Sequence, residues 1–364
     1  MKKIFALISI VIVMVAFPSV AFANPTLTIE EATRRAINNS NAIRNSQDNV
    51  TLTRENEQRM RDVFWQLPTW TGSDFIRFQA DIMRIEAGRA VTLNSITAQR
   101  ETLGFIVANH FANIVMAQNE LVLFDENLVI MRQDIEMLQT METLGMASGT
   151  QLRIAQNGYQ QALHNRANLI ASIETAFREL NRLMGTNQNN IYDLVFEQNF
   201  EPLQDIDIER YIRLHQNSDI QVDNAVRQLS IARFELNSHG GEPFNRITGT
   251  GEPGAITRTE RELAVTQGNR DLEAARESVE NNVIDLHNNI LSLELAIQGT
   301  ELQISILAQE LLVMEVQYYV GHLIKIELDR TVLEMYNLQE TLRRHKVNHG
   351  LLVMQLTNPS IALG

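Results

Sequence analysis

A glycine-rich stretch is the first place in this sequence where residue types and spacing suggest chemistry. "GTGEPG", residues 249–254, matches the G-x-G-x-x-G pattern that cradles the pyrophosphate of a dinucleotide. In that role the glycines follow a buried strand and open a helix, whereas the residues before Gly249 have the composition of a loop. The sequence therefore does not support nucleotide binding, and we expect no cofactor.

Two histidines, His345 and His349, are four residues apart in "HKVNH", which is the spacing of two metal ligands on one helix face. No carboxylate lies between them as in H-E-x-x-H, and no further ligand is near in the sequence. We therefore expect a solvated helix face and no metal. A third histidine, His287, interrupts an apolar stripe described below, where a register-setting or water-lined position between helices is the favoured interpretation.

The sequence does not indicate catalytic residues either. Serine, histidine and acidic residues are plentiful, but none falls in the strand–turn–helix context of a nucleophile. The 44 acidic residues leave a paired-carboxylate enzyme open without pointing to any particular pair. We expect the protein not to be an enzyme and assign no catalytic residue.

Residues 1–23 have the pattern of a secretory signal peptide. Lys2 and Lys3 precede an apolar run of 14 residues, and Ala21-Phe22-Ala23 forms a small-x-small cleavage site. The run is shorter than the ~20 residues needed to span a bilayer, and no other run of that length is evident in the sequence. We expect an exported protein that begins at Asn24.

Composition narrows the function classes further. Without the two leader lysines the chain has 29 basic residues against 44 acidic ones, a net charge of −15. Phosphate contacts need a basic surface, so this balance argues against nucleic-acid binding. The sequence has no cysteine, which excludes a lipid-attachment thiol, a disulfide framework and a zinc–thiolate site.

An internal repeat organises the rest of the chain. "LGMASGTQLRIA" (144–155) and "VGHLIKIELDRT" (320–331) each place a glycine after an apolar residue and a leucine seven residues beyond it, and the two glycines are 176 residues apart. "IEEATRRAINNSNAI" (29–43) parallels "IERYIRLHQNSDI" (208–220) at nearly the same offset. We interpret residues 24–190 and 191–364 as two tandem helical repeats of one elongated domain, joined around residues 187–202.

The elements that carry the two glycine corners are predicted to be very long helices. An apolar stripe, with residues three or four positions apart, precedes the first corner. The residues found 176 positions further along the sequence are also apolar, except His287 and Thr300. No proline falls between Asp74 and Leu144, so one helix of ~100 Å is expected there. The stripe comprises Leu103, Val107, Phe111, Ile114, Ala117, Leu121, Phe124, Leu128, Met131, Ile135 and Leu138.

Each long helix follows an interruption rich in helix breakers. The first, residues 66–72, contains Pro68 and Gly72, and the second, residues 238–254, contains five glycines and two prolines. Neither shows the alternation of apolar and polar residues typical of a strand pair. The expected fold class is therefore all-α, with long antiparallel coiled-coil helices in a tandem-duplicated unit.

This combination of a leader, a duplicated unit, the opening "LTIEEATRRAINNSNAI" (27–43) and two corners with leucine seven residues after glycine resembles the TolC-like outer-membrane efflux protein family. The resemblance covers residues 24–364. It implies a protomer of a trimeric helical barrel that crosses the periplasm, a channel rather than an enzyme. A membrane-fusion (adaptor) protein and an inner-membrane transporter are its implied partners.

The resemblance also implies functional residues. The corners would be the tips at which the adaptor docks: Gly145, Met146, Ala147, Ser148, Gly321, His322, Leu323 and Ile324. Some family members ring the inner entrance with acidic residues just after the corners. The matching positions here are Gln151, Glu327 and Arg330, of which only Glu327 is acidic, so Arg330 would pair with a neighbouring Glu327.

One departure from the family keeps a second function class open. Family members carry long strand pairs in both interruptions that build an outer-membrane β-barrel, whereas the two interruptions here contain no evident membrane strands. The chain is thus interpreted either as a component of an export or efflux duct or as a non-conducting extracytoplasmic coiled-coil scaffold. The expected location is the periplasm or the outer membrane, or the extracytoplasmic surface of a cell that has no outer membrane.

Overall fold

The structure is a computed structural model that describes residues 24–66, 72–196, 200–203, 207–238, 244–245, 250–251 and 258–361. The expected signal peptide, residues 1–23, lies outside the described residues. So do residues 67–71 of the first interruption and most of the second, including Gly249 and residues 252–254 of the glycine-rich stretch.

The described chain is almost entirely helical, as predicted. The first repeat contains β1 (Thr26–Thr28), α1 (Ile29–Asn39), α2 (Asn41–Gln66), α3 (Gly72–Thr143) and α4 (Gly149–Met184), and β2 (Asp193–Val195) follows at the join between the repeats. The second contains α5 (Ile208–Ser218), α6 (Ile220–Asn237), β3 (Phe244–Asn245), β4 (Thr250–Gly251), α7 (Arg258–Tyr319) and α8 (Lys325–Thr357). The predicted long helix is confirmed, since α3 runs for 72 residues, or ~108 Å at 1.5 Å per residue.

Two small sheets were not predicted from the sequence. β1 and β2 pair in parallel, with Leu27 opposite Leu194. β3 and β4 are strands of two residues each that pair antiparallel inside the second interruption, where no strand pair was expected. Strands of two or three residues are too short to show an alternating pattern, so the sequence carries no signal for them.

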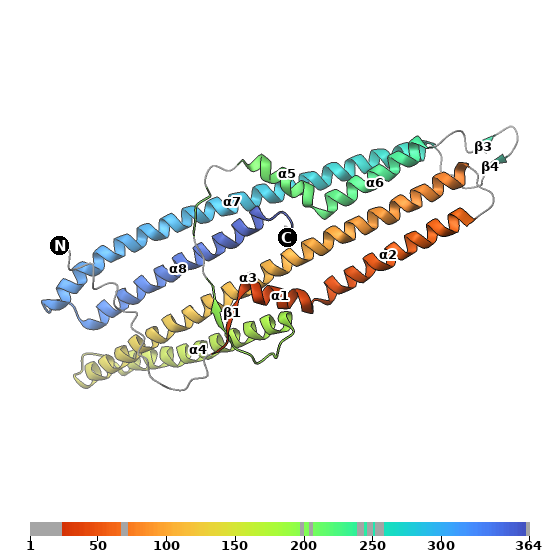
Figure 1. Ribbon diagram of the computed structural model, residues 1–364. Coiled ribbons are helices and arrows are strands. Elements are labelled where there is room, and N and C mark those ends of the chain that lie inside the picture. The colour runs from red at the N-terminus through yellow and green to blue at the C-terminus, as the bar shows by residue number, and fades with distance from the viewer. Residues whose placement is uncertain are drawn as a thin grey trace, which may run out of the picture.

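The long helices form an elongated wall (Figure 1). α3 and α7 run along most of its length, and α3 contacts both helices of the second repeat that lie beside it, α6 and α8. Towards the two corners the helices lie side by side in the order α4–α3–α8–α7, and towards the interruptions in the order α2–α3–α6–α7. Both corners therefore lie at one end of the molecule.

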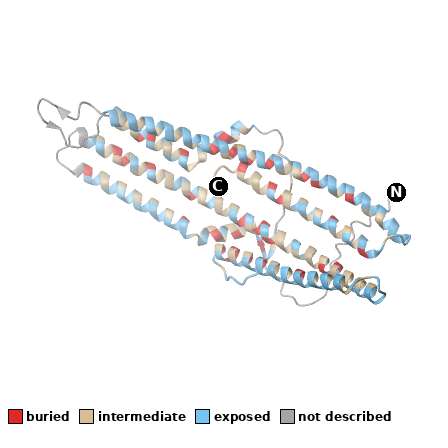
Figure 2. Ribbon diagram, turned by 180° about the vertical axis from the view of Figure 1, so that it is seen from behind, coloured by how far each residue is buried: buried red, intermediate tan, exposed pale blue. Residues whose placement is uncertain are grey.

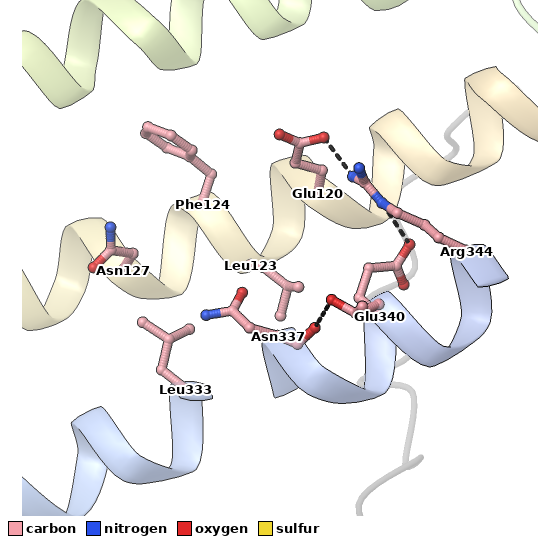
Figure 3. A pocket seen from close by; sticks show the side chains of 9 residues that line it. Glu120, Leu123, Phe124, Asn127, Leu333, Asn337, Glu340 and Arg344 are labelled. Atoms are coloured by element: carbon pink, nitrogen blue, oxygen red, sulfur yellow. Dashed lines mark hydrogen bonds and ion pairs between the residues drawn. The ribbon is translucent and has the colours of Figure 1, made fainter. Parts of the chain in front are cut away.

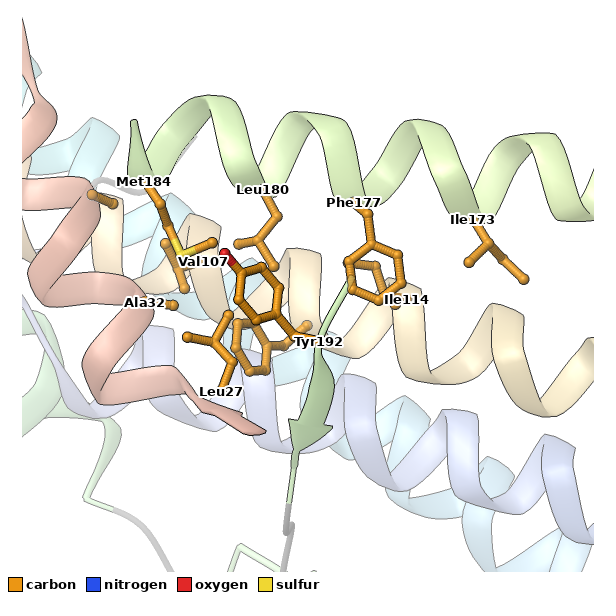
Figure 4. Close-up of a cluster of buried hydrophobic side chains, with 11 residues drawn as sticks. Leu27, Ala32, Val107, Ile114, Ile173, Phe177, Leu180, Met184 and Tyr192 are labelled. Atoms are coloured by element: carbon orange, nitrogen blue, oxygen red, sulfur yellow. The ribbon is translucent and has the colours of Figure 1, made fainter. Parts of the chain in front are cut away.

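The two clusters of buried hydrophobic side chains lie in the middle of this wall. In the first repeat, side chains of β1, α1 and α4 enclose Val107, Phe111 and Ile114 of α3, the central part of the predicted stripe (Figure 4). A matching cluster in the second repeat includes Val283 and Ile290 of α7. Nearer the corners the helices are mostly half-buried or exposed (Figure 2). The corner end thus has a large surface available for contacts.

Candidate functional site: the corner end

The first corner is a Schellman helix ending followed by a capped helix start. Gly145 has a φ of +70°, its N–H donates to the Glu142 carbonyl at 2.9 Å, and the Met146 N–H donates to the Met141 carbonyl at 2.8 Å. Ser148 then begins α4 in a capping box: the Gln151 N–H donates to Ser148 Oγ at 3.2 Å, and the Ser148 N–H donates to Gln151 Oε1 at 2.8 Å.

The second corner has the same helix ending but a different helix start. Gly321 has a φ of +78°, its N–H donates to the Tyr318 carbonyl at 3.0 Å, and the His322 N–H donates to the Gln317 carbonyl at 2.8 Å. The residue before α8 is Ile324, which has no side-chain group to cap the helix. The prediction that glycine makes both corners agrees with these positive φ angles, which cost glycine little.

Large apolar side chains are exposed at both corners. Met146 and Ile324 are 70% and 52% exposed, whereas Ala147 and Leu323 are half-buried. The sequence analysis missed residues that precede the glycines and are equally open: Leu144, Tyr319 and Val320. The signal for Tyr319 and Val320 was the run Tyr318-Tyr319-Val320, since three consecutive apolar residues cannot all face the inside of one helix.

The expected entrance positions are engaged in different ways. Gln151 belongs to the capping box, and Glu327 is exposed. Arg330 reaches α3 instead of a glutamate, because its Nη2 lies 2.5 Å from both carboxylate oxygens of Asp134. That hydrogen bond raises the pKa of Arg330. Within the chain, Arg330 therefore joins the second repeat to the first.

The exposed face of α7 carries an apolar stripe that reaches the second corner. Six of its side chains and the adjoining Val320 are 40–69% exposed and lie within a stripe roughly 80° wide at 100° per residue: Leu291, Leu295, Leu302, Ile306, Val313, Val316 and Val320. Thr300 and Leu307, on the opposite face, are buried. α7 is also the single helix, among the described residues, that is long and apolar enough to cross a membrane, with 22% of its best 18-residue window buried.

One expectation about the histidines is wrong. His349 is 2% exposed rather than solvated, and its Nε2 lies 2.9 Å from Glu294 Oε1, which also accepts from the Leu203 N–H. His345 is half-buried, with Nδ1 3.4 Å from the Thr300 hydroxyl. In the described part of the chain no cluster of three or more His, Cys, Asp and Glu residues is arranged to hold a metal. Periodicity alone could not show that residues 200–203 cover this face of α8.

Comparisons with solved structures agree on the fold. No protein-family model matches the chain, and no curated protein sequence matches it. Among solved structures, CusC, whose report describes transmembrane channel formation, has a TM-score of 0.67 at 13% identity, with 92% of each chain covered. VceC, an outer membrane protein of Vibrio cholerae, has a TM-score of 0.61 at 11% identity and covers 90% of this chain and 95% of its own.

A third relative extends the pattern. The CmeC outer membrane channel of Campylobacter jejuni has a TM-score of 0.59 at 10% identity, with 91% of this chain and 85% of that chain covered. The chain therefore has the helical-barrel protomer fold of TolC-family outer membrane channels. The resemblance noted from the sequence is confirmed at the level of the fold.

Proposed function

We propose that this protein is exported and builds the wall of an export or efflux duct as a homotrimer. The observation that carries the proposal is the exposed apolar stripe of α7 at the edge of an open wall. α4 and α7 form opposite edges of the wall near the corners (Figure 1). A wall that is open on both edges buries the α7 stripe when identical copies join edge to edge and close into a ring.

A bilayer is a poorer partner for this stripe than a second copy. A helix that crosses a membrane by itself is apolar all round, but α7 is packed against α8 on the face that carries Leu307. Its acidic residues Glu294 and Glu301 are engaged by α8, at 2.9 Å from His349 and 2.8 Å from Lys346. One 18-residue window of α7 is as apolar as a membrane span because two faces of the helix are apolar there, one inside the protomer and one at its edge.

The corners are the proposed docking tips for an adaptor, with an inner-membrane transporter beyond it. Tyr319, Val320 and Ile324 at the second corner, and Leu144 and Met146 at the first, present apolar surface at one end of the assembly. Gln151, Glu327 and Arg330 follow the corners, and in a trimer they would surround the entrance. The location that fits this arrangement is the periplasm or the outer membrane.

The test is the shape of the purified mature chain and its dependence on the α7 stripe. Electron cryo-microscopy should show a hollow ring with three-fold symmetry. Leu302→Asp with Ile306→Asp should convert it to monomers in sedimentation, because two charges would be buried at the interface. Gln303→Asp, on an exposed position of α7 outside the stripe, is the matched control and should leave the ring intact.

Other results would point elsewhere. A ring that survives the double substitution would show that α7 is not the contact between copies. A solid bundle with no lumen would favour the non-conducting scaffold. For the tips, Leu323→Asp with Ile324→Asp should abolish crosslinking to a co-expressed adaptor encoded beside this chain while the ring remains, and undiminished crosslinking would remove the docking role.

A further inference from the structure

The contact between α3 and α8, where the two repeats meet towards the corners, leaves a cavity that is partly open to solvent. Its volume is about 350 Å³, and Figure 3 shows the side chains that line it. Both helices contribute to its lining. Leu123, Phe124 and Leu333 are its apolar lining residues, and Glu120, Glu340 and Arg344 are its charged ones. A contact with such a gap is held less firmly than a close-packed one, because the lining atoms lack partners across the gap.

Among the charged lining residues, Glu340 of α8 is a largely buried carboxylate. Its side chain is 11% exposed, and its Oε1 is fully enclosed with no donor at hydrogen-bond distance, although Asn119 of α3 lies close enough to stabilise the ionised carboxylate in part. Arg343 and Arg344 approach its two oxygens only to 3.7 and 4.0 Å, which is too far for hydrogen bonds. Arg344 is closer to Glu120 of α3, at 2.6 Å. The ionised Glu340 carboxylate is therefore desolvated and poorly compensated.

The other charges around this contact do not remove that deficit. α3 contributes Glu120, which is a second negative charge and takes Arg344 as its partner. α7, on another side of α8, carries Glu301, held by Lys346, and the exposed Glu310. The cations available to Glu340 are thus Arg343 and Arg344 from its own helix.

The direction of the pH effect follows from the burial. Burial raises the pKa of Glu340 above its ordinary value of 4.5, and Arg343, Arg344 and the Asn119 amide oppose this shift only in part. Between the ordinary and the raised pKa, the folded protein binds a proton more readily than the unfolded chain does. Stability therefore falls as the pH rises through this interval, and the neutral carboxyl is the form that the contact accommodates better.

We propose that Glu340 is a proton-sensitive latch between the two repeats: α3 and α8 close on each other when its carboxyl is neutral and separate at the cavity when it is ionised. The latch controls how the α7–α8 corner sits relative to the α3–α4 corner. It is a property of the single chain and does not depend on the proposed duct.

The first test compares Glu340→Gln, which keeps the shape and removes the charge, with Glu334→Gln on an exposed position of the same helix. Thermal midpoints of the full mature chain are measured from pH 5 to pH 8. Glu340→Gln should raise the midpoint at pH 8 by about 2 °C or more, and this gain should shrink towards pH 5. Glu334→Gln should show no such pH-dependent gain. A Glu340→Gln midpoint that is unchanged or lower at pH 8 would overturn the latch.

A second test leaves Glu340 in place. The sequence has no cysteine, so spin labels at Met146→Cys and His322→Cys report only the distance between the corners. Labelled chains are diluted with unlabelled ones so that only distances within one chain are measured. The distance distribution should be narrow at pH 5 and broader or longer at pH 8. Identical distributions at both pH values would contradict the proposal.

Discussion

The two corners share their helix ending and differ in the helix start that follows. Both glycines have positive φ angles and both endings make the same pair of backbone hydrogen bonds. The first corner then caps α4 with Ser148 and Gln151, whereas the second begins α8 at Ile324 with no side-chain cap. The helix ending, which the corners share, is held by backbone hydrogen bonds. The helix start, in which they differ, depends on the side chain of the residue before the helix.

The far ends of the same two helices show a similar contrast. In the first repeat the Asn39 amide donates to the carbonyls of Arg182 and Leu183 at the end of α4. In the second, the buried His215 ring bonds the Leu356 carbonyl at the end of α8, at 2.9 Å. Each short helix is thus tied to the end of its own repeat, once by a group that does not titrate and once by one that does.

The largest expected effect tests the part that the corners share. Gly145→Val and Gly321→Val should each lower the free energy of unfolding by about 1–2 kcal/mol, since a β-branched residue is strained at positive φ. A new Cβ would meet no atom within 4 Å at either glycine, so the cost is conformational and should be nearly equal. Denaturant melts of the two variants measure it. A loss of stability in only one of the two variants would show that the two helix endings are not equivalent.

The next effect tests the capped corner. Ser148→Ala removes the acceptor for the Gln151 N–H and should cost about 1 kcal/mol in the same melts. Ile324→Ala at the matching position of the second corner serves as the control and removes no cap. Equal losses for the two variants would mean that the capping box contributes nothing particular to the first corner.

A smaller gain is expected when the second corner is made like the first. Ile324→Ser gives α8 the cap that it lacks and should raise the free energy of unfolding by about 0.5 kcal/mol or more. If Ile324 is also a docking contact, the same variant should bind the adaptor more weakly. A loss of stability would show that the exposed isoleucine is packed more tightly than its 52% exposure indicates.

The smallest effect is a pH dependence that belongs to the second repeat. Burial lowers the pKa of His215, although its bond to Leu356 and the charge of Asp219 oppose the shift. Stability should therefore fall as the pH drops below about 6.5, which is opposite in sign to the Glu340 effect. His215→Gln should make this slope shallower, whereas His164→Gln, at an exposed position, should leave it unchanged.

An unaltered slope in His215→Gln would assign the acid sensitivity to another group. His110 of α3 is one candidate, because burial lowers its pKa too. The comparison of the two repeats would then be wrong on this point, since His110 lies in the first repeat.

Much of the fold was predictable because it depends on local sequence. The long helices follow from the steps of three and four and from the lack of proline between Asp74 and Leu144. The corners follow from Gly145 and Gly321, because few other residue types adopt a positive φ at low cost. The repeat offset of 176 residues then predicted that the second half would fold like the first.

The candidate site was predictable only in part. Glycine spacing located both corners, but exposure decides which apolar side chains present a surface, and Ala147 and Leu323 are half-buried while Tyr319 is 87% exposed. Arg330 was expected to pair with a neighbouring Glu327. Its partner within the chain is Asp134, 196 residues away, which no local pattern indicates.

The sequence by itself determined where helices run and where they turn, because helix periodicity, proline and glycine act over a few residues. Only the tertiary structure decided which faces are covered. It buried His349 under residues that precede α5, paired β1 with β2 across the whole first repeat, and left the second apolar face of α7 exposed. Burial depends on helices brought together from distant parts of the chain, and α3 and α8 meet with Glu340 between them for that reason.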